Sequence, residues 1–186
     1  MAGIMKTLCR YCVHLLGDMD CVSIQIFEEF DGLVSERSLG RAAQVTLDHE
    51  RVDRSLSLVI ADDATVQDLN KRYRGLDETT DVLSFAFDSQ GHYYGKDSPP
   101  TDWTEDAEFV LPASEGNGLG EVIISFPQAV RQAADAGRDV NDELAQLVTH
   151  GILHLLGHDH MEQDEQRVMA AREKAILAGS MGAASE

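Results

Sequence analysis

Four of the chain's seven histidines lie within eleven residues, in the stretch HGILHLLGHDH at positions 150–160. The segment from 140 to 157 has the apolar periodicity of a helix, with an expected buried stripe of Leu144, Val148, Ile152 and Leu155. His150 and His154 are then one turn apart on the flank of this helix, where both imidazoles can point to one spot. Gly157 is expected to end the helix and turn the chain back. A histidine three residues further on can therefore approach the same spot.

Three of these histidines have the spacing of zinc ligands. His150, His154 and His160 follow the pattern H-x3-H-x2-G-x2-H, which is the ligand spacing of the metzincin zinc proteases. Two nitrogens from a helix and one from the following loop, with a fourth position open, have the geometry of a catalytic rather than a structural zinc. We therefore predict one zinc ion per chain at these side chains, although imidazole also suits copper, nickel and cobalt.

The residue after the first histidine argues against a peptidase. Metzincins have their general-base glutamate there, whereas this chain has Gly151. A zinc ion would still lower the pKa of bound water and polarise a substrate oxygen. His158 fits an i, i+4, i+8 stripe, but a helix that stops at Gly157 cannot carry it on the same face. His158 is therefore assigned outside the ligand triad, and Asp159 is a candidate to orient a ligand imidazole.

The length of 186 residues suffices for one compact domain with a sizeable core and short appendages. No apolar run approaches the roughly 18 to 20 residues of a membrane helix. The start of the chain is a poor signal peptide, because Arg10 and His14 interrupt its apolar stretch. We therefore expect a cytoplasmic protein with no membrane partner.

The cysteines are few and lie near the N-terminus. Cys9, Cys12 and Cys21 are an odd number, which argues against a disulfide framework. Together with His14 they leave two interpretations open, a second zinc site or an N-terminal extension with thiols. The extension is favoured, because a lone C-x2-C is weak evidence for a metal site.

The net charge of −18 argues against tight, non-specific binding of nucleic acid, which usually needs a basic face. The charge is unevenly distributed, however. The segment 88–118 contains seven acidic residues against one basic residue, Lys96. This long stretch with little periodicity is interpreted as a solvated insertion, and a functional lid is the alternative.

Periodicity along the rest of the chain predicts a single α+β domain. The expected strands are 21–27, 55–61, 80–87 and 119–125, and the expected helices are 35–50, 63–76, 127–137, 140–157 and 161–179. The expected N-caps are Ser35, Asp63 and Asn141, and the expected core residues of the last helix are Val168, Met169, Ala175 and Leu177. The architecture is then a mixed sheet of about four strands with helices packed on it and the metal site at the end of a helix. The expected boundaries are a flexible extension at 1–20, the domain at 21–178 with its acidic insertion at 88–118, and a flexible tail at 179–186.

Three sequence motifs occur in an order that is typical of one protein family. The pattern H-G-x-L-H-L-x-G-y-D-H is matched at 150–160, except that His158 stands where tyrosine is usual. The pattern L-N-x-x-Y-R-x-x-D-x-P-T-D-V-L-S-F is matched by LNKRYRGLDETTDVLSF at 69–85, with Thr79 in place of proline. The pattern L-G-D-I-x-I-S is matched by LGEVIIS at 119–125. In these motifs the chain resembles the YbeY family, which are bacterial ribosomal-RNA maturation factors.

The resemblance implies a zinc-dependent, single-strand-specific endoribonuclease. Its implied role is in ribosomal RNA maturation, at the 3′ end of the small-subunit rRNA, and in ribosome quality control. It implies His150, His154 and His160 as metal ligands, and Arg74 and His150 as catalytic residues. The implied partner is single-stranded or ribosomal RNA, and ribosomal proteins of the small subunit are a further candidate.

The chemistry of RNA cleavage agrees with these residue types. Cleavage needs a nucleophilic oxygen, stabilised charge on a phosphate and a proton for the leaving group, and zinc can supply one of the first two. Arg74 can bind a phosphate in a bidentate manner that lysine cannot copy. Lys71 and Arg72 complete the densest basic cluster of the chain, although a solvated helix end explains them equally well. The general base is left open, with Glu121 and Glu143 as candidates.

Two other functions stay open at this point. One is a zinc hydrolase of another substrate, such as a peptide, against which Gly151 counts. The other is a non-catalytic ribosome-assembly factor whose metal only stabilises the fold, against which the open fourth ligand position counts. An acidic protein that docks on ribosomal proteins can nevertheless act without strong affinity for RNA.

Overall fold

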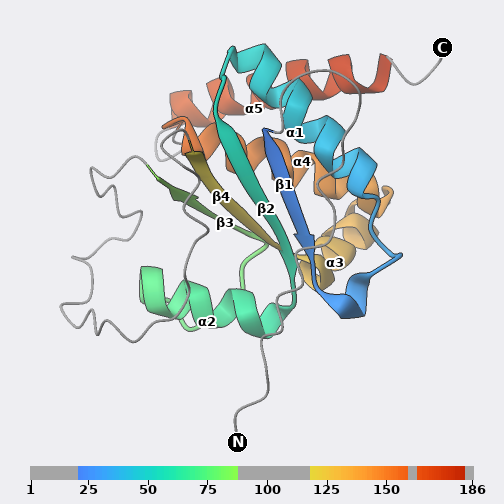
Figure 1. Ribbon diagram of the computed structural model, residues 1–186, viewed down its shortest axis with the longest axis vertical. Helices are drawn as coiled ribbons and strands as arrows, with labels where there is room; N and C mark the ends of the chain where they lie inside the picture. The colour runs from blue at the N-terminus through green and yellow to red at the C-terminus, as the bar shows by residue number, and fades with distance from the viewer. Residues whose placement is uncertain (1–20, 88–117, 159–162, 183–186) are drawn as a thin grey trace, which may run out of the picture.

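The structure is a computed structural model and describes residues 21–87, 118–158 and 163–182. In these residues the chain forms a four-stranded sheet with helices on both faces (Figure 1). The strands are β1 (Val22–Ile26), β2 (Ser55–Ala61), β3 (Val82–Ala86) and β4 (Gly118–Ser125). The helices are α1 (Glu36–Glu50), α2 (Asp63–Arg74), α3 (Phe126–Ala136), α4 (Val140–Leu155) and α5 (Gln163–Gly182), with a short 3-10 helix, η1 (Glu28–Phe30). The predicted α+β class is confirmed.

Two expected boundaries differ slightly from the observed elements. Gly118, expected as the last residue of the acidic insertion, is the first residue of β4. Helix α5 extends to Gly182, into the segment expected as a tail. The predictions for the first 20 residues, for 88–117 and for His160 lie outside the described residues.

The sheet is mixed, as predicted. Its strand order is β1-β2-β4-β3, in which β1, β2 and β4 are parallel neighbours and β3 runs antiparallel to β4. Parallel neighbours need a crossover connection, and α1 provides it between β1 and β2. β3 is therefore the terminal strand on one side of the described sheet.

Side chains alternate between the two faces of the sheet, and each face has its own core. The core on the face covered by α1 and α4 includes Leu58, Ile60, Val122 and Ile124. The core on the opposite face, covered by α2, includes Val59, Ala61, Val66, Leu69 and Ile123. Figure 1 shows this arrangement, with α2 on one face and α1, α4 and α5 on the other. β2 is buried on both faces, which explains its nearly continuous apolar sequence.

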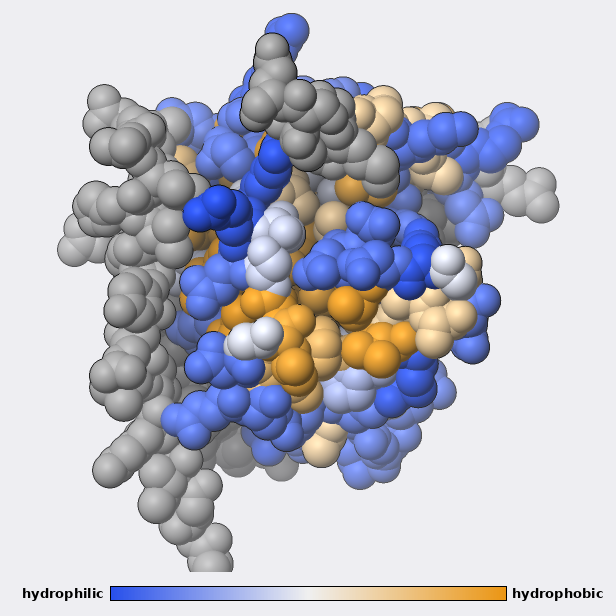
Figure 2. Space-filling model, turned by 90° about the vertical axis from the view of Figure 1, so that its right-hand side faces the viewer, coloured by the Kyte–Doolittle hydropathy of each residue, from blue (hydrophilic) through white to orange (hydrophobic). Residues whose placement is uncertain are grey.

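The sheet is covered less completely at β1 than at its centre. The apolar side chains of this region that are only half-buried are Val22, Ile24, Ile26 and Phe27. Leu33, which follows shortly after, is 60% exposed. Figure 2 views the molecule from the side on which β1 and α1 lie in Figure 1, and shows apolar surface surrounded by polar residues.

The N-caps differ from expectation at two of three helices. Ser35 caps α1 as predicted, and its Oγ accepts a hydrogen bond from the backbone N–H three residues later. Asp62 rather than Asp63 caps α2, and Asp139 rather than Asn141 caps α4. Aspartate and asparagine can both cap a helix, so residue type alone does not decide between these neighbours. The N-cap is the residue that has an extended backbone directly before the first turn.

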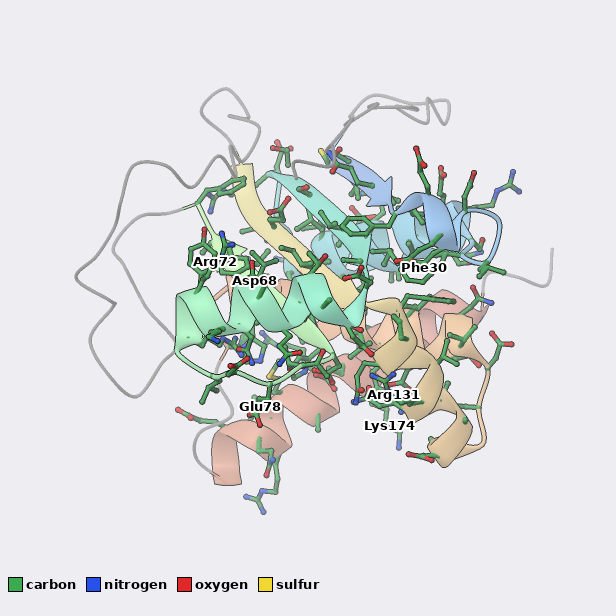
Figure 3. The ribbon with its side chains drawn as sticks, turned by 90° about the horizontal axis from the view of Figure 1, so that it is seen from below. Phe30, Asp68, Arg72, Glu78, Arg131 and Lys174 are labelled. Atoms are coloured by element: carbon green, nitrogen blue, oxygen red, sulfur yellow. The ribbon has the colours of Figure 1, made fainter. Side chains whose placement is uncertain are left out.

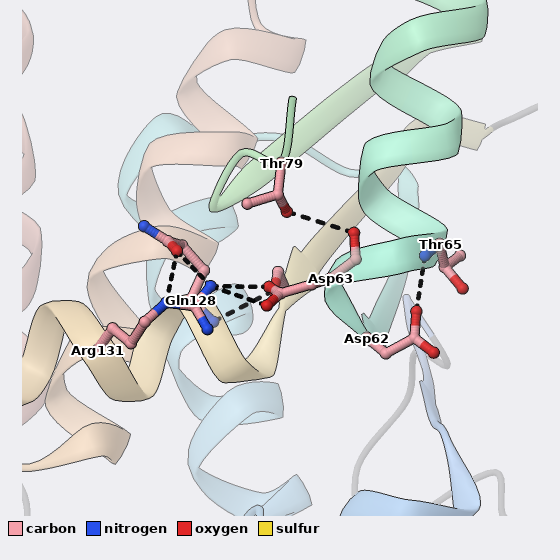
Figure 4. A network of polar contacts seen from close by, with 7 residues as sticks. Asp62, Asp63, Thr65, Thr79, Gln128 and Arg131 are labelled. Atoms are coloured by element: carbon pink, nitrogen blue, oxygen red, sulfur yellow. Dashed lines mark hydrogen bonds and ion pairs between the residues drawn. The ribbon is translucent and has the colours of Figure 1, made fainter. Parts of the chain in front are cut away.

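Asp63 instead joins three segments that lie far apart in the sequence (Figure 4). Its carboxylate accepts hydrogen bonds from Nη2 of Arg131 at 2.9 Å and from Oγ of Ser125 at 2.6 Å. Its backbone carbonyl accepts a hydrogen bond from Oγ1 of Thr79, the residue that replaces the proline of the family pattern, at 3.3 Å. These contacts tie the start of α2 to the start of α3 and to the segment that precedes β3.

The buried face of α5 is one residue out of phase with the expected one. Met169 is buried as predicted, but Val168 is 59% exposed, Ala175 is exposed and Ile176 is buried instead. Met169 and Ile176 are seven residues apart, so they share a helix face and pack together against Leu153 of α4. This contact determines which polar side chains of α5 face α4.

Two glycines let α4 approach the sheet closely. A Cβ atom on Gly151 would lie 2.6 Å from Cγ1 of Val122 and 3.1 Å from Oγ of Ser84. The same Ser84 hydroxyl donates a hydrogen bond to the carbonyl of Gly151 at 3.1 Å. At the end of the helix, a Cβ atom on Gly120 of β4 would lie 2.7 Å from Cδ2 of Leu155. The backbone of α4 therefore rests directly on β3 and β4.

We expect Gly151→Ala to lower the free energy of unfolding by about 1–3 kcal/mol, because the added methyl group overlaps Val122 and α4 has to move away from the sheet. Gly40→Ala is the matched control, since Gly40 also lies in a helix but its Cβ would meet Cδ1 of Ile24 at an ordinary 3.6 Å. The control is expected to be neutral or stabilising by up to about 1 kcal/mol. Chemical denaturation measures both values, and equal stability of the two variants would contradict the close packing.

Candidate metal centre

Helix α4 ends in a Schellman motif. Its last helical residue is Leu155, and Gly157 follows in the left-handed region with a φ of 84°. The N–H of Gly157 donates to the carbonyl of His154 at 2.9 Å, and the N–H of His158 donates to the carbonyl of Leu153 at 3.0 Å. The predicted helix stop at Gly157 is confirmed, and the chain reverses direction there.

His150 and His154 lie one turn apart on α4, and their imidazoles point to one spot. Their Nε2 atoms are 3.0 Å apart, and their ring centroids are 4.5 Å apart with an interplanar angle of 77°. Both residues are half-buried. The rigid helix therefore presents two ring nitrogens together at its surface.

The spacing of these nitrogens fits a shared metal ion. Two nitrogens bound to one tetrahedral zinc at about 2.0–2.1 Å are about 3.4 Å apart, which is close to the observed separation. His160, the third predicted ligand, lies outside the described residues. Within the described part of the chain, no group of three or more His, Cys, Asp or Glu side chains is arranged to hold a metal. The structure thus contains two of the three predicted ligands, and the metal centre remains a proposal.

Glu173 of α5 contacts this pair and was not expected from the sequence. Its Oε1 lies 2.7 Å from Nδ1 of His150, and its side chain is only 14% exposed. An ionised carboxylate only accepts hydrogen bonds, so Nδ1 of His150 carries the hydrogen and Nε2 presents its lone pair. The packing of Met169 and Ile176 against Leu153 brings Glu173 to this position. The contact between α4 and α5 joins residues that are far apart in the sequence, so no sequence spacing predicts that Glu173 lies beside His150.

A second polar network holds His158. Nη1 of Arg172 donates to Nε2 of His158 at 2.8 Å and to Oε2 of Glu50 at 3.1 Å. The other carboxylate oxygen of Glu50 lies 3.0 Å from Nδ1 of His49. These contacts connect the end of α1, α5 and the segment after α4. The Nε2 lone pair of His158 is used by Arg172, which supports its assignment outside the ligand triad.

Arg74 is the last residue of α2 and is half-buried. Edge-to-face packing of Tyr73 on Phe85, with ring centroids 5.0 Å apart, fixes this end of α2 beside β3. Buried Asn70 donates from Nδ2 to the carbonyl of Glu78 at 2.8 Å, which holds the segment after α2. Because α2 and α4 cover opposite faces and both contact β3, Arg74 and the histidine pair lie on either side of this terminal strand.

The two other basic residues in the last turn of α2 are paired with carboxylates. Nζ of Lys71 is 2.7 Å from Oδ2 of Asp77, and Nη2 of Arg72 is 2.9 Å from Oδ2 of Asp68. The hydrogen bond and the opposite charge raise the pKa of Lys71 and lower the pKa of Asp77. Figure 3 shows Asp68 and Arg72 on the outer surface of α2, with Glu78 on the segment that leads back to β3. Lys71 and Arg72 therefore fit a solvated helix end better than a phosphate-binding patch.

The two candidate general bases have different surroundings. Val122 packs against α4, so the preceding Glu121 points to the opposite face of the sheet, away from the histidine pair. Glu121 is 2% exposed, and burial raises the pKa of its carboxyl. Glu143 lies on α4, lines the same cavity as His150 and forms an ion pair with Nε of Arg138 at 2.6 Å. Of the two, Glu143 is the one on the side of the histidines.

The comparisons with known proteins point to one family. The family model described as endoribonuclease YbeY matches residues 25–180. A protein named endoribonuclease YbeY from Dehalococcoides mccartyi (strain CBDB1) is 42% identical over 158 residues, which cover 84% of this chain and 90% of that protein. Its namesake from Roseiflexus castenholzii is 39% identical over 168 residues, covering 89% and 95%. The solution structure of TM1509 from Thermotoga maritima has the same fold, with a TM-score of 0.54 at 20% identity, covering 87% of this chain and 89% of that one.

The fold and the histidine pair define an α+β protein with a candidate metal centre at the end of a helix. The chain belongs to the YbeY endoribonuclease family. None of the helices in its described part is long and apolar enough to cross a bilayer.

Proposed function

We propose that this protein is a zinc-dependent endoribonuclease that cuts single-stranded RNA during maturation of ribosomal RNA. The observation that carries the proposal is the convergence of two imidazole nitrogens at the end of α4, in a chain whose relatives are named endoribonucleases. The proposed role is at the 3′ end of the small-subunit rRNA and in ribosome quality control, in the cytoplasm. Ribosomal proteins of the small subunit are proposed as further partners. Residues 21–178 form the proposed catalytic domain, with the acidic segment 88–118 as an insertion.

His150, His154 and His160 hold one zinc ion in this proposal. The turn at Gly157 supports it, because the chain reverses direction directly before the third ligand. A bound zinc ion supplies Lewis acidity and positive charge next to a phosphate. Glu173 keeps His150 in the tautomer whose Nε2 lone pair points to the site.

Arg74 is proposed to bind the reacting phosphate. Its planar guanidinium can donate two parallel hydrogen bonds to phosphate oxygens. It lies across β3 from the histidine pair, so an RNA strand that crosses this edge of the sheet would meet both. His150 is the second proposed catalytic residue, and it acts as a metal ligand whose orientation is set by Glu173.

The packing of Gly151 argues against peptide hydrolysis at this site. Metzincins hold their general-base glutamate at the corresponding position. Here even a Cβ atom would overlap Val122, so a carboxylate at residue 151 would displace α4 from the sheet. A purely structural metal is disfavoured because His150 is 26% exposed and lines an open cavity.

We expect His154→Ala to lose its zinc, because the two remaining nitrogen donors rarely hold the ion. His49→Ala is the matched control, an exposed histidine on α1 that should leave one zinc per chain. His158→Ala should also keep the metal, because its imidazole is bound to Arg172. Elemental analysis of the purified proteins measures the stoichiometry. One zinc per chain in His154→Ala would contradict the ligand assignment.

We expect the zinc-loaded protein to cut labelled single-stranded RNA and to leave casein intact. Arg74→Lys should lower turnover about 10²-fold or more, because lysine keeps the charge but loses the planar fork. Arg72→Lys is the matched control, with the same change two residues away on an exposed, paired side chain, and should behave as wild type.

Both variants are compared in single-turnover cleavage assays, with thermal melts to check folding. Cleavage of casein, or intact RNA with the zinc-loaded wild type, would overturn the proposed function. Equal rates for Arg74→Lys and Arg72→Lys would remove Arg74 from the mechanism.

A further inference from the structure

An open cavity adjoins His150 on the side of α3 and the start of β3. Its volume of about 520 Å³ lies within the range of roughly 300–1,000 Å³ that is typical of pockets for small organic ligands. Among the described residues, its wall includes His150 but neither His154 nor Arg74. Because His150 forms part of its wall, a group attached to a phosphate at the histidine pair can enter it.

The charges in the cavity wall disfavour a second phosphate. The lining residues include three with carboxylates, Asp81, Asp135 and Glu143, and a single one with a guanidinium, Arg138. Arg138 is already paired with Glu143, whose side chain is only 4% exposed. The cavity therefore has excess negative charge and suits an uncharged group that donates hydrogen bonds, such as a base or a ribose.

Two glutamine amides in the wall are held in defined orientations. Nε2 of Gln132 donates to Oδ2 of Asp81 at 3.0 Å, which leaves its Oε1 as an acceptor towards a ligand. Oε1 of Gln146 accepts from Nη1 of Arg138 at 2.5 Å, which leaves its Nε2 as a donor. The wall thus contributes an amide acceptor and an amide donor, which are the types of group that recognise the edge of a base.

We propose that this cavity is a base-binding subsite for the nucleoside next to the reacting phosphate, and that it prefers a base with an amino group to uracil. Adenine, cytosine and guanine each bring an exocyclic amino group as a donor to the acceptor-rich wall. Uracil has no amino group, and its single N3–H lies between two carbonyl oxygens, which the carboxylates repel. Gln132 and Gln146 are the specificity-determining residues. The inference rests on the proposed function, because it takes the phosphate to be bound at His150.

Nucleoside binding tests the subsite without any cleavage. In NMR titrations of the full-length, zinc-loaded protein at millimolar ligand, adenosine and cytidine are expected to shift the side-chain amide signals of Gln132 and Gln146, and uridine is expected to shift them at least several-fold less. The amide of Gln44, exposed on α1, provides the reference that should not move. Equal shifts with uridine, or no shifts with any nucleoside, would overturn the inference.

Cleavage of oligonucleotides tests the preference in the reaction. Single-stranded uridine runs with one adenosine or cytidine are expected to be cut next to that residue roughly tenfold faster than elsewhere. Gln146→Leu should bring this ratio close to one while cleavage within the uridine run persists, and Asp135→Asn should reduce it by admitting uracil. Gln44→Leu should leave it unchanged. Thermal melts establish that each variant is folded.

The outcomes separate this inference from the function on which it rests. The subsite would be overturned if RNA were cut without base preference, or if Gln146→Leu left the ratio of cleavage rates unchanged. The endoribonuclease proposal would stand in both cases. Nucleoside shifts at Gln132 and Gln146 in a protein that cuts no RNA would support the subsite and overturn the endoribonuclease.

Discussion

The contact between Gly151 and the sheet is the constraint on which the other features of the site depend. Because the helix backbone lies against Val122 and Ser84, α4 has a defined position over β3 and β4. Its flank then holds His150 and His154 beside the terminal strand. The same contact leaves no room for a side chain where a metzincin peptidase has its catalytic glutamate. The close approach of the α4 backbone to the side chains of Val122 and Ser84 therefore both positions the histidine pair and restricts its chemistry.

The charged side chains of the described residues are arranged as expected for an acidic protein that acts on RNA through a few specific contacts. Lys71 and Arg72 are neutralised by neighbouring carboxylates, so general attraction to phosphates is weak. In the proposed function, recognition depends on a few placed groups, namely Arg74 for a phosphate and the proposed subsite beside His150 for an uncharged nucleoside. Separate groups for the phosphate and the nucleoside favour selective binding over tight, non-specific binding, because each group makes a directional contact with its part of the substrate.

Local sequence patterns predicted the parts of this structure that depend on local interactions. The short apolar run of β2, the helix stop at Gly157 and the single-turn spacing of the two histidines follow from local pattern and turn chemistry, and the structure agrees with them. The phase of α5 was mispredicted, because its buried face is selected by Leu153 on another helix. Glu173 was missed for the same reason: its contact with His150 exists only once α5 has packed on α4.

The central claim is that the end of α4 presents two imidazole nitrogens to one metal ion. Anomalous diffraction at the zinc absorption edge, from crystals of the zinc-loaded protein, tests it most directly. The account predicts one strong anomalous peak per chain, within about 2.1 Å of Nε2 of both His150 and His154. A peak elsewhere in the molecule, or coordination through Nδ1 of His150 with Glu173 turned away, would contradict it.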